Sequence, residues 1–226
     1  AIVDTLQPGQ SWNNFGFYKC ITTSGKQKEY LEKIMRKSSF EIVKPYITNT
    51  FKPNSKPPMP IIGVHTKDQS DTVNLIKTFY LRFPQYRWFT FRDLRGLSEK
   101  EFAKSLSECF LSVWIDDKSS FGTFPLESMA CSVPVIGKIP NMNPEWMSED
   151  NGIWIQDQTL LIDFVADFIQ NWLEDNINPD MYENMKTTIS QYTDKDKFEK
   201  EVEDLFSKFL NDRADSFEEQ LNKTEE

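Results

Sequence analysis

Apolar residues along the chain follow two patterns: helical spacing and short continuous runs. Apolar positions spaced by three and four residues predict helices over 73–83, over 161–172 and from Asp194 onward. Short apolar runs predict strands at 61–65, 87–91, 111–115, 133–137 and 152–155. Because these strands are apolar throughout and alternate with helices, the pattern favours an α/β fold, a Rossmann-like parallel sheet with helices on both faces.

Two segments have the form of a capping box, which marks the start of a helix. Residues 24–27 and 98–101 each place a serine three residues before a glutamine or glutamate. The helix that follows Ser98 is expected to carry Phe102, Leu106 and Cys109 on one face.

Shorter elements complete the predicted order. Residues 40–47 favour a short strand, and residues 125–131 favour a helix with Pro125 near its first turn. Residues 51–60 contain four prolines, which neither continue a helix nor sit in a central strand, so this segment is expected to be a linker.

Composition narrows the class of protein. Of 226 residues, 38% are hydrophobic and 14% aromatic, enough for a packed core. No apolar run approaches the roughly 18 residues that a membrane span needs, and residues 1–12 lack the features of a signal peptide, so we expect a cytoplasmic protein. Cys20, Cys109 and Cys131 form no CxxC pair and are expected to be reduced, with the last two in the core.

Charge is distributed unevenly. The net charge is −9, and it divides into +5 for residues 1–60, +1 for 61–140 and −15 for 141–226. Such acidity disfavours nucleic acids and anionic membranes as main partners, because both repel a negative surface. A nucleotide needs only a few local donors, which the near-neutral middle third can supply.

The segment 113–137 is where ligand chemistry is expected. In parallel α/β sheets ligands bind where strands end and helices begin. Here Gly122 permits close backbone approach, and Thr123 is expected to be the N-cap of a helix whose free N–H groups suit a phosphate. Glu127 then lies one turn into that helix, where its carboxylate can accept hydrogen bonds from ribose. The alternative is that the glycine and threonine serve only the turn.

These residues also carry a family resemblance. Phe121-Gly122, followed by the run 125–137 (PLESMACSVPVIG), resembles the donor-binding signature of retaining glycosyltransferases of the GT-B class, in the glycogen-synthase and sucrose-synthase-like group. Residues 151–154 (NGIW) resemble the strand that follows in that family, and 51–53 with Pro45 resemble its interdomain linker. The likeness covers about residues 40–175. It implies the C-terminal, donor-binding half of a GT-B architecture, which transfers a hexosyl group from a nucleotide-diphosphate sugar with retention and without a metal cofactor.

The sequence departs from the family pattern at the first of its two glutamates. Ser119 stands in that position, while Glu127 matches the second. Asp117 is our candidate for the missing catalytic carboxylate, with Asp116 beside it. Both aspartates have the alternative role of capping or solvating the loop.

A second departure concerns the cations that neutralise a diphosphate. The family has an arginine after the first strand of this domain, whereas here Lys67 is the best replacement and His65 a further donor; Arg92 and Arg95 are alternatives that are otherwise surface charges. The expected donor-binding residues are His65, Lys67, Ser119, Ser120, Phe121, Gly122, Thr123, Phe124 and Glu127.

Other chemistries lack their motifs. A single histidine and the absence of Cys/His spacing disfavour a metal site, and there is no GxxxxGK[ST] or GxGxxG loop. The Asp-Lys-Asp at 194–196 is interpreted as a helix cap. Trp146, Trp154 and Trp172 are expected in the core, Trp146 with the weakest case.

The expected organisation has three parts. Residues 1–55 are a linker and remnant of a preceding domain, 56–192 bind the nucleotide sugar, and 193–226 form a helix with an acidic tail. Because a GT-B enzyme needs a second, acceptor-binding domain, we expect this chain alone to be inactive. A degenerate, non-catalytic GT-B domain that binds nucleotide or serves as an interaction module is the main alternative, and a nucleotide-sugar epimerase is a third.

Overall fold

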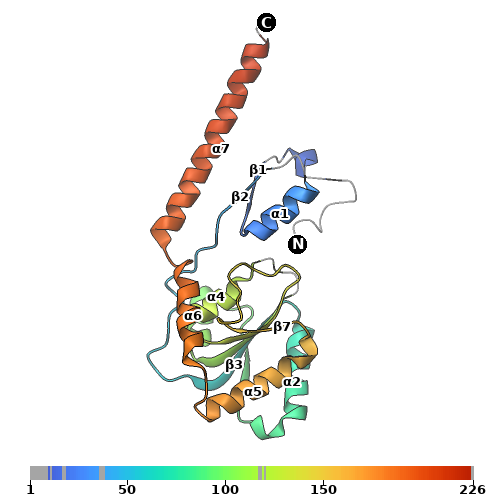
Figure 1. Ribbon diagram of the computed structural model, residues 1–226, viewed down its shortest axis with the longest axis vertical. Coiled ribbons are helices and arrows are strands. Elements are labelled where there is room, and N and C mark those ends of the chain that lie inside the picture. Colours follow the sequence, from blue (N-terminus) through green and yellow to red (C-terminus); the bar gives the residue numbers. More distant parts are fainter. Residues whose placement is uncertain are drawn as a thin grey trace. The chain divides into compact units, whose positions relative to one another are not determined.

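The computed structural model describes residues 10, 12–16, 19–35, 39–116, 119 and 121–224, with the side chains of the last helix described as far as Arg213. The chain divides into two compact units (Figure 1). One unit is residues 47–193, and the other combines residues 1–46 with 194–226. No helix of the described residues is long and apolar enough to cross a membrane.

A five-stranded parallel sheet forms the centre of the unit 47–193. Its strands are ordered β4-β3-β5-β6-β7 and every neighbouring pair is parallel, which confirms the sequence prediction. The strands are β3 (Met59–Thr66), β4 (Thr90–Asp93), β5 (Cys109–Ile115), β6 (Val135–Lys138) and β7 (Ile153–Ile155).

Helices cover both faces of this sheet. They are α2 (Gln69–Arg82), α3 (Glu99–Ser107), α4 (Thr123–Ala130), α5 (Leu161–Leu173) and α6 (Pro179–Ser190), with short 3-10 turns at Pro84–Tyr86 and Gln158–Leu160. Two separate apolar cores lie between the sheet and these helices. One core joins the sheet to α3, α4 and α6, and the other joins it to α2 and α5. Neighbouring residues of β5 divide between these cores, since Val113 belongs to one and Trp114 to the other.

Two boundary predictions need correction. The fourth strand begins at Thr90 and not at residue 87, because the preceding residues continue the 3-10 turn and the amide of Phe89 bonds the carbonyl of Tyr86. Cys109 does not lie on the helix face of α3, since that helix ends at Ser107 and Cys109 opens β5. Cys109 is nevertheless buried, as is Cys131, and burial raises the pKa of both thiols to about 12.

Helix α6 was missed by the sequence prediction, although its start carries a recognisable signal. Asn178 is the N-cap, its Oδ1 accepting a hydrogen bond from the amide of Asp180 at 3.0 Å, and Pro179 occupies the first turn. Met185 and Ile189, four residues apart, face the core.

The second unit contains a two-stranded parallel sheet and two helices. These are β1 (Lys19–Thr22), β2 (Ser39–Ile42), α1 (Gly25–Ile34) and α7 (Lys195–Thr224), after a 3-10 turn at Trp12–Phe15. Ser24 caps α1, as predicted, but Gln27 bonds the amide of Thr23 and not that of Ser24, so the capping box is half formed. The cap at 194–196 is confirmed, because Asp194 Oδ1 accepts from the amide of Lys197 at 2.9 Å.

Candidate functional site

A cavity of about 400 Å³ lies at the carboxyl ends of β3 and β5, where α4 begins. Seven of the nine expected donor-binding residues line it: His65, Lys67, Ser119, Gly122, Thr123, Phe124 and Glu127. These come from two strand ends and one helix start, and the parallel sheet brings them together because all its strands end at one edge.

Gly122 forms the turn that starts α4. Its φ is +70°, and an added Cβ would lie 2.6 Å from Cζ2 of Trp114, so both backbone conformation and space require glycine. Gly122 is therefore the N-cap, and the prediction that Thr123 caps the helix is wrong: Thr123 is the first helical residue. No side chain of the described residues caps this helix start. The amides of Thr123 and Phe124 belong to the first turn of the helix, where backbone N–H groups lack an intrahelical acceptor. Pro125, the next residue, has no backbone N–H group.

Glu127 lies on the same helix with its carboxylate at the cavity. The pKa of Glu127 is raised to about 7, first by burial and then by the charge of Glu99. Glu99 stays ionised, because hydrogen bonds from Thr48 and Thr50 lower its pKa. Among the described residues none donates a hydrogen bond to the Glu127 carboxylate, so this acceptor faces the cavity unused.

His65 and Phe124 form an aromatic wall. Their rings stack with centroids 4.8 Å apart and an interplanar angle of 15°, and Phe102 meets the His65 ring edge-on. The pKa of His65 is lowered by burial and by the charge of Lys67, which favours the neutral ring. Its Nδ1 is buried and has no hydrogen-bond partner among the described residues.

Lys67 and Ser119 share one carboxylate. Asp116 is 3% exposed; its Oδ2 lies 3.6 Å from Nζ of Lys67, and its Oδ1 accepts from the amide of Ser119 at 3.0 Å. Lys67 itself is largely exposed at the cavity mouth. Asp116 therefore holds both the cation and the start of the loop. Asp117 and Ser120, which the sequence also assigned to the site, lie outside the described residues.

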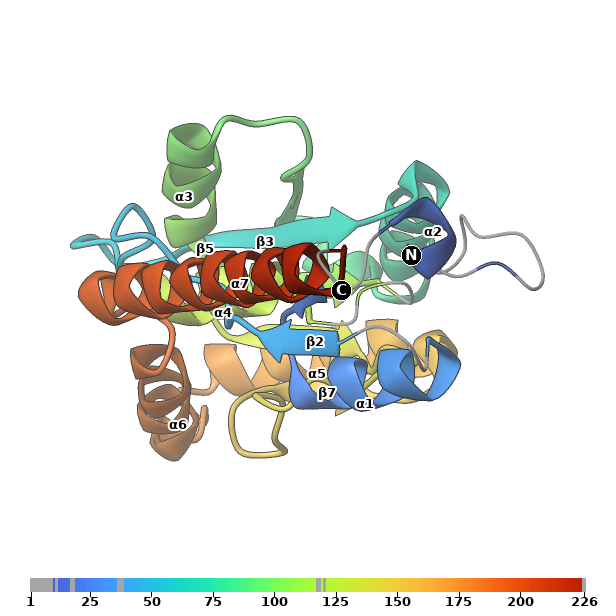
Figure 2. The ribbon, with the colours of Figure 1, turned by 90° about the horizontal axis from the view of Figure 1, so that it is seen from above.

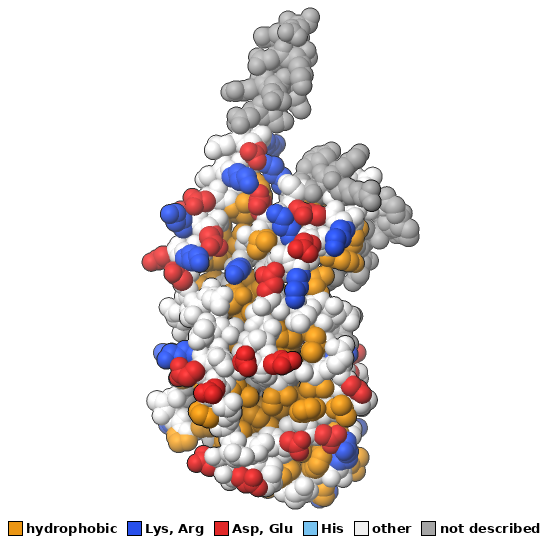
Figure 3. All heavy atoms as spheres, in the orientation of Figure 1, with side chains coloured by type: hydrophobic (Ala, Val, Ile, Leu, Met, Phe, Trp, Pro, Cys, Tyr) orange, Lys and Arg blue, Asp and Glu red, His pale blue; other side chains and the backbone are white. Residues whose placement is uncertain are grey.

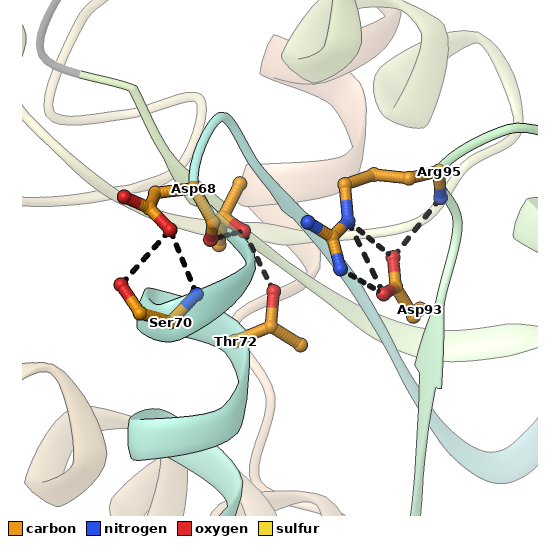
Figure 4. Close-up of polar contacts among 6 residues, drawn as sticks. Asp68, Ser70, Thr72, Asp93 and Arg95 are labelled. Atoms are coloured by element: carbon orange, nitrogen blue, oxygen red, sulfur yellow. Dashed lines mark hydrogen bonds and ion pairs between the residues drawn. The ribbon is translucent and has the colours of Figure 1, made fainter.

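The two alternative arginines are placed differently. Arg92 does not line the cavity, and it donates to the carbonyl of Ser105 and to Glu108. Arg95 does line it, but its guanidinium folds back onto Asp93 (Figure 4) and lowers the pKa of that carboxyl. In the same view Asp68 caps α2 by accepting from the amide of Ser70 at 2.8 Å, so it belongs to the helix start.

Phe121 points into the core and not into the cavity. It is buried against Tyr192, with ring centroids 5.8 Å apart, and its carbonyl accepts from Nε1 of Trp146 at 2.8 Å. Trp146 is 6% exposed, which confirms that it is a core residue.

Several wall residues escaped the sequence analysis. The cavity is completed by Phe51, Leu94, Gly96, Leu97, Glu99, Phe102 and Trp114. The order of elements could have indicated the loop 94–97, because this loop follows β4, whose carboxyl end lies at the same edge of the sheet as those of β3 and β5.

No family model matches the chain. It is 27% identical over 209 residues to an alpha-1,6-glucosyltransferase of Actinobacillus pleuropneumoniae serotype 7 (strain AP76), a match that covers 89% of this chain and 63% of that protein. Among solved structures, sucrose-phosphate synthase from Thermosynechococcus elongatus superposes with a TM-score of 0.61 at 14% identity, covering 85% of this chain and 58% of the synthase.

A second solved structure is an isolated domain. The C-terminal domain of the glycosyl transferase group 1 family protein LpcC from Francisella tularensis superposes with a TM-score of 0.51 at 13% identity, over 65% of this chain and 97% of that domain. The chain has the fold of a GT-B C-terminal domain. The chain spans less than two thirds of the curated relative, and its cavity occupies the strand-end position at which ligands bind in open parallel sheets.

Proposed function

We propose that this chain is the donor-binding part of a glycosyltransferase that transfers a hexosyl group from a nucleotide-diphosphate sugar. The observation that carries the proposal is the pairing, on one helix, of an uncapped start at Gly122 with an unused carboxylate at Glu127, both on the same cavity. The uncapped amides suit a diphosphate, and the carboxylate one turn later suits ribose hydroxyls. Two proteins of similar fold support a nucleotide as ligand: Anabaena HepE was solved in complex with UDP-glucose, and a pneumococcal O-GlcNAc transferase with UDP and GlcNAc.

Each wall of the cavity has a role in this proposal. The positive end of α4 and Lys67 stabilise the departing diphosphate. These two groups take the place of the metal ion that other transferases use. Asp116 keeps Lys67 near the phosphate position before the ligand arrives. The aromatic wall of His65 and Phe124 excludes water from one side of the site. Retention of anomeric configuration and an acceptor domain outside this chain follow from the family resemblance.

A non-catalytic role is the second candidate, and one observation favours it. Ser119 stands where the family has its first glutamate, and its described backbone is held by Asp116. Asp116 is buried and shared between Ser119 and Lys67, which leaves it poorly available as a replacement carboxylate. Such a domain would keep nucleotide binding without transfer.

Calorimetry on this chain tests the proposed ligand. UDP, GDP and ADP are titrated separately, each with and without EDTA, and we expect at least one to bind equally well in both conditions. Absence of heat from all three at millimolar concentration contradicts the donor site, and binding that EDTA abolishes contradicts the metal-free arrangement. Turnover is then assayed with the longest natural chain that includes an acceptor domain. Nucleotide binding without turnover there favours the non-catalytic candidate.

A further inference from the structure

A second cavity, of about 910 Å³, shares no lining residue with the candidate donor site. It is formed by the irregular segment 50–59 on one side and by α3 on the other. The amide of Met59 bonds the carbonyl of Glu108, so one end of the groove lies where β3 and β5 begin; Figure 2 shows α3 and the direction of β3. The donor cavity lies where these strands end, and the two linings meet at the start of α3, where Thr50 of the groove donates a hydrogen bond to Glu99 of the donor cavity.

Four lysines line this groove. Lys52 and Lys56 come from the irregular segment, and Lys100 and Lys104 are one turn apart on α3. None of the four forms an ion pair with a carboxylate among the described residues. Among the described residues of the lining, Glu108 alone is a carboxylate, and Arg92 neutralises it at 2.7 Å.

This concentration of positive charge is unusual in so acidic a protein. The chain carries a net charge of −9, and acidic side chains are spread over the face seen in Figure 3. Like charges one helical turn apart, as at Lys100 and Lys104, destabilise a helix, and two further lysines across the groove add to the repulsion. An anion in the groove relieves this repulsion. At physiological salt, charges beyond about 8 Å are screened, so the groove acts on a ligand independently of the distant acidic surface.

We propose that the lysine groove binds a linear polymer that carries closely spaced phosphate groups. A single phosphate fills only part of about 910 Å³, whereas a chain lying along the groove reaches lysines on both walls. The side chains of Asn54 and Ser55 add neutral polar groups to the lining, which suit the several oxygens of each phosphate.

The alternatives fit the lining less well. Pro53, Pro57 and Pro58 remove backbone donors from the segment that an added peptide strand would have to pair with. A bilayer surface needs apolar side chains that project from a flat or convex face, and this lining is concave, with Met59 as its exposed large hydrophobic residue. A phosphate polymer requires neither feature.

The test uses the full chain and fluorescently labelled inorganic polyphosphate, measured by anisotropy at several salt concentrations. We expect binding that weakens with salt with a log–log slope of about −3, as for about four cation contacts to a single-stranded polyanion. The variant K52Q/K56Q/K100Q/K104Q should lose at least tenfold in affinity. The control K77Q/K186Q/K197Q/K200Q removes the same charge from exposed positions outside the groove and should bind nearly as well as the wild type.

Four results would overturn the proposal. Equal losses in the two quadruple variants would mean that overall charge, and not the groove, controls binding. Polyglutamate binding as tightly as polyphosphate would point to an acidic peptide, and tighter binding to vesicles of anionic lipid would point to a membrane. If UDP competes with polyphosphate, then polyphosphate binds in the donor cavity and not in the groove. The inference does not rest on the proposed transferase, since E127Q should leave polyphosphate affinity unchanged whether or not it alters nucleotide binding.

Discussion

Gly122 and Trp114 are packed so closely that the glycine has no room for a side chain. A Cβ at Gly122 would lie 2.6 Å from Cζ2 of the indole, and φ at this position is +70°. The core tryptophan of β5 thus fixes the turn that opens α4, and with it the direction of the helix start that faces the candidate donor cavity. The first prediction follows from this contact.

Gly122→Ala should lower the free energy of unfolding by roughly 2–5 kcal/mol, because the left-handed backbone costs about 1–2 kcal/mol and overpacking adds about 1–3 kcal/mol. Urea denaturation measures the loss. Gly96→Ala is the matched control, since Gly96 has φ +73° but nothing within 4 Å of an added Cβ. It should show only the backbone cost. Equal losses in the two variants would mean that the contact with Trp114 contributes nothing.

Lys67→Ala should weaken binding of a nucleoside diphosphate by about tenfold or more, because a charge-assisted hydrogen bond contributes roughly 1.5–3 kcal/mol. Binding of the uncharged nucleoside should hardly change, since the ammonium group contacts only phosphate in the proposed arrangement. Calorimetry on both ligands separates the two effects, and Lys77→Ala on α2 is the control for general charge. Equal losses for both ligands would remove Lys67 from the phosphate site and favour Arg95, which also lines the cavity.

The raised pKa of Glu127 predicts a pH dependence of stability. Its pKa is about 7 in the folded chain against an ordinary value of 4.5, so the folded state binds this proton more strongly than the unfolded state. The resulting stabilisation is fully present below about pH 4.5 and is lost as the pH rises through 7. It amounts to at most about 3 kcal/mol.

Glu127→Gln removes this dependence. Relative to the wild type, the variant should gain stability between pH 4.5 and 7 and keep a constant difference above that window. Urea denaturation across the pH range measures it. Glu149→Gln, at an exposed position, should follow the wild-type profile. A Glu127→Gln profile parallel to the wild type at every pH would show that the Glu127 carboxylate titrates normally.

The parallel sheet and its edge were predictable because they depend on short apolar runs and on the order of elements. Burial on both faces makes a strand such as β5 apolar throughout, and that pattern is local in the sequence. The same logic located the strand-to-helix junction at Gly122 and Glu127. The start of α6 was also local, and reading Asn178-Pro179 as a cap would have found it.

The remaining features depend on contacts between distant residues. Thr123 looks like the better cap by residue type, and only the packing of Trp114 against the turn makes Gly122 the N-cap. Phe121 sits beside cavity residues in sequence but turns toward Tyr192, about seventy positions away. Likewise, no local pattern pairs Glu99 with Glu127, although the charge of Glu99 helps to raise the pKa of Glu127.

The most direct test of the donor site is the nucleoside diphosphate affinity of Glu127→Gln, measured by calorimetry alongside its melting temperature at pH 8. Glutamine keeps the shape of the side chain and removes the charged acceptor for ribose. We predict that affinity falls by about one to two decades, as expected for a lost charged hydrogen bond of roughly 1.5–3 kcal/mol, while the variant melts no lower than the wild type. Unchanged affinity together with a lowered melting temperature would contradict the account and make Glu127 a structural residue of α4.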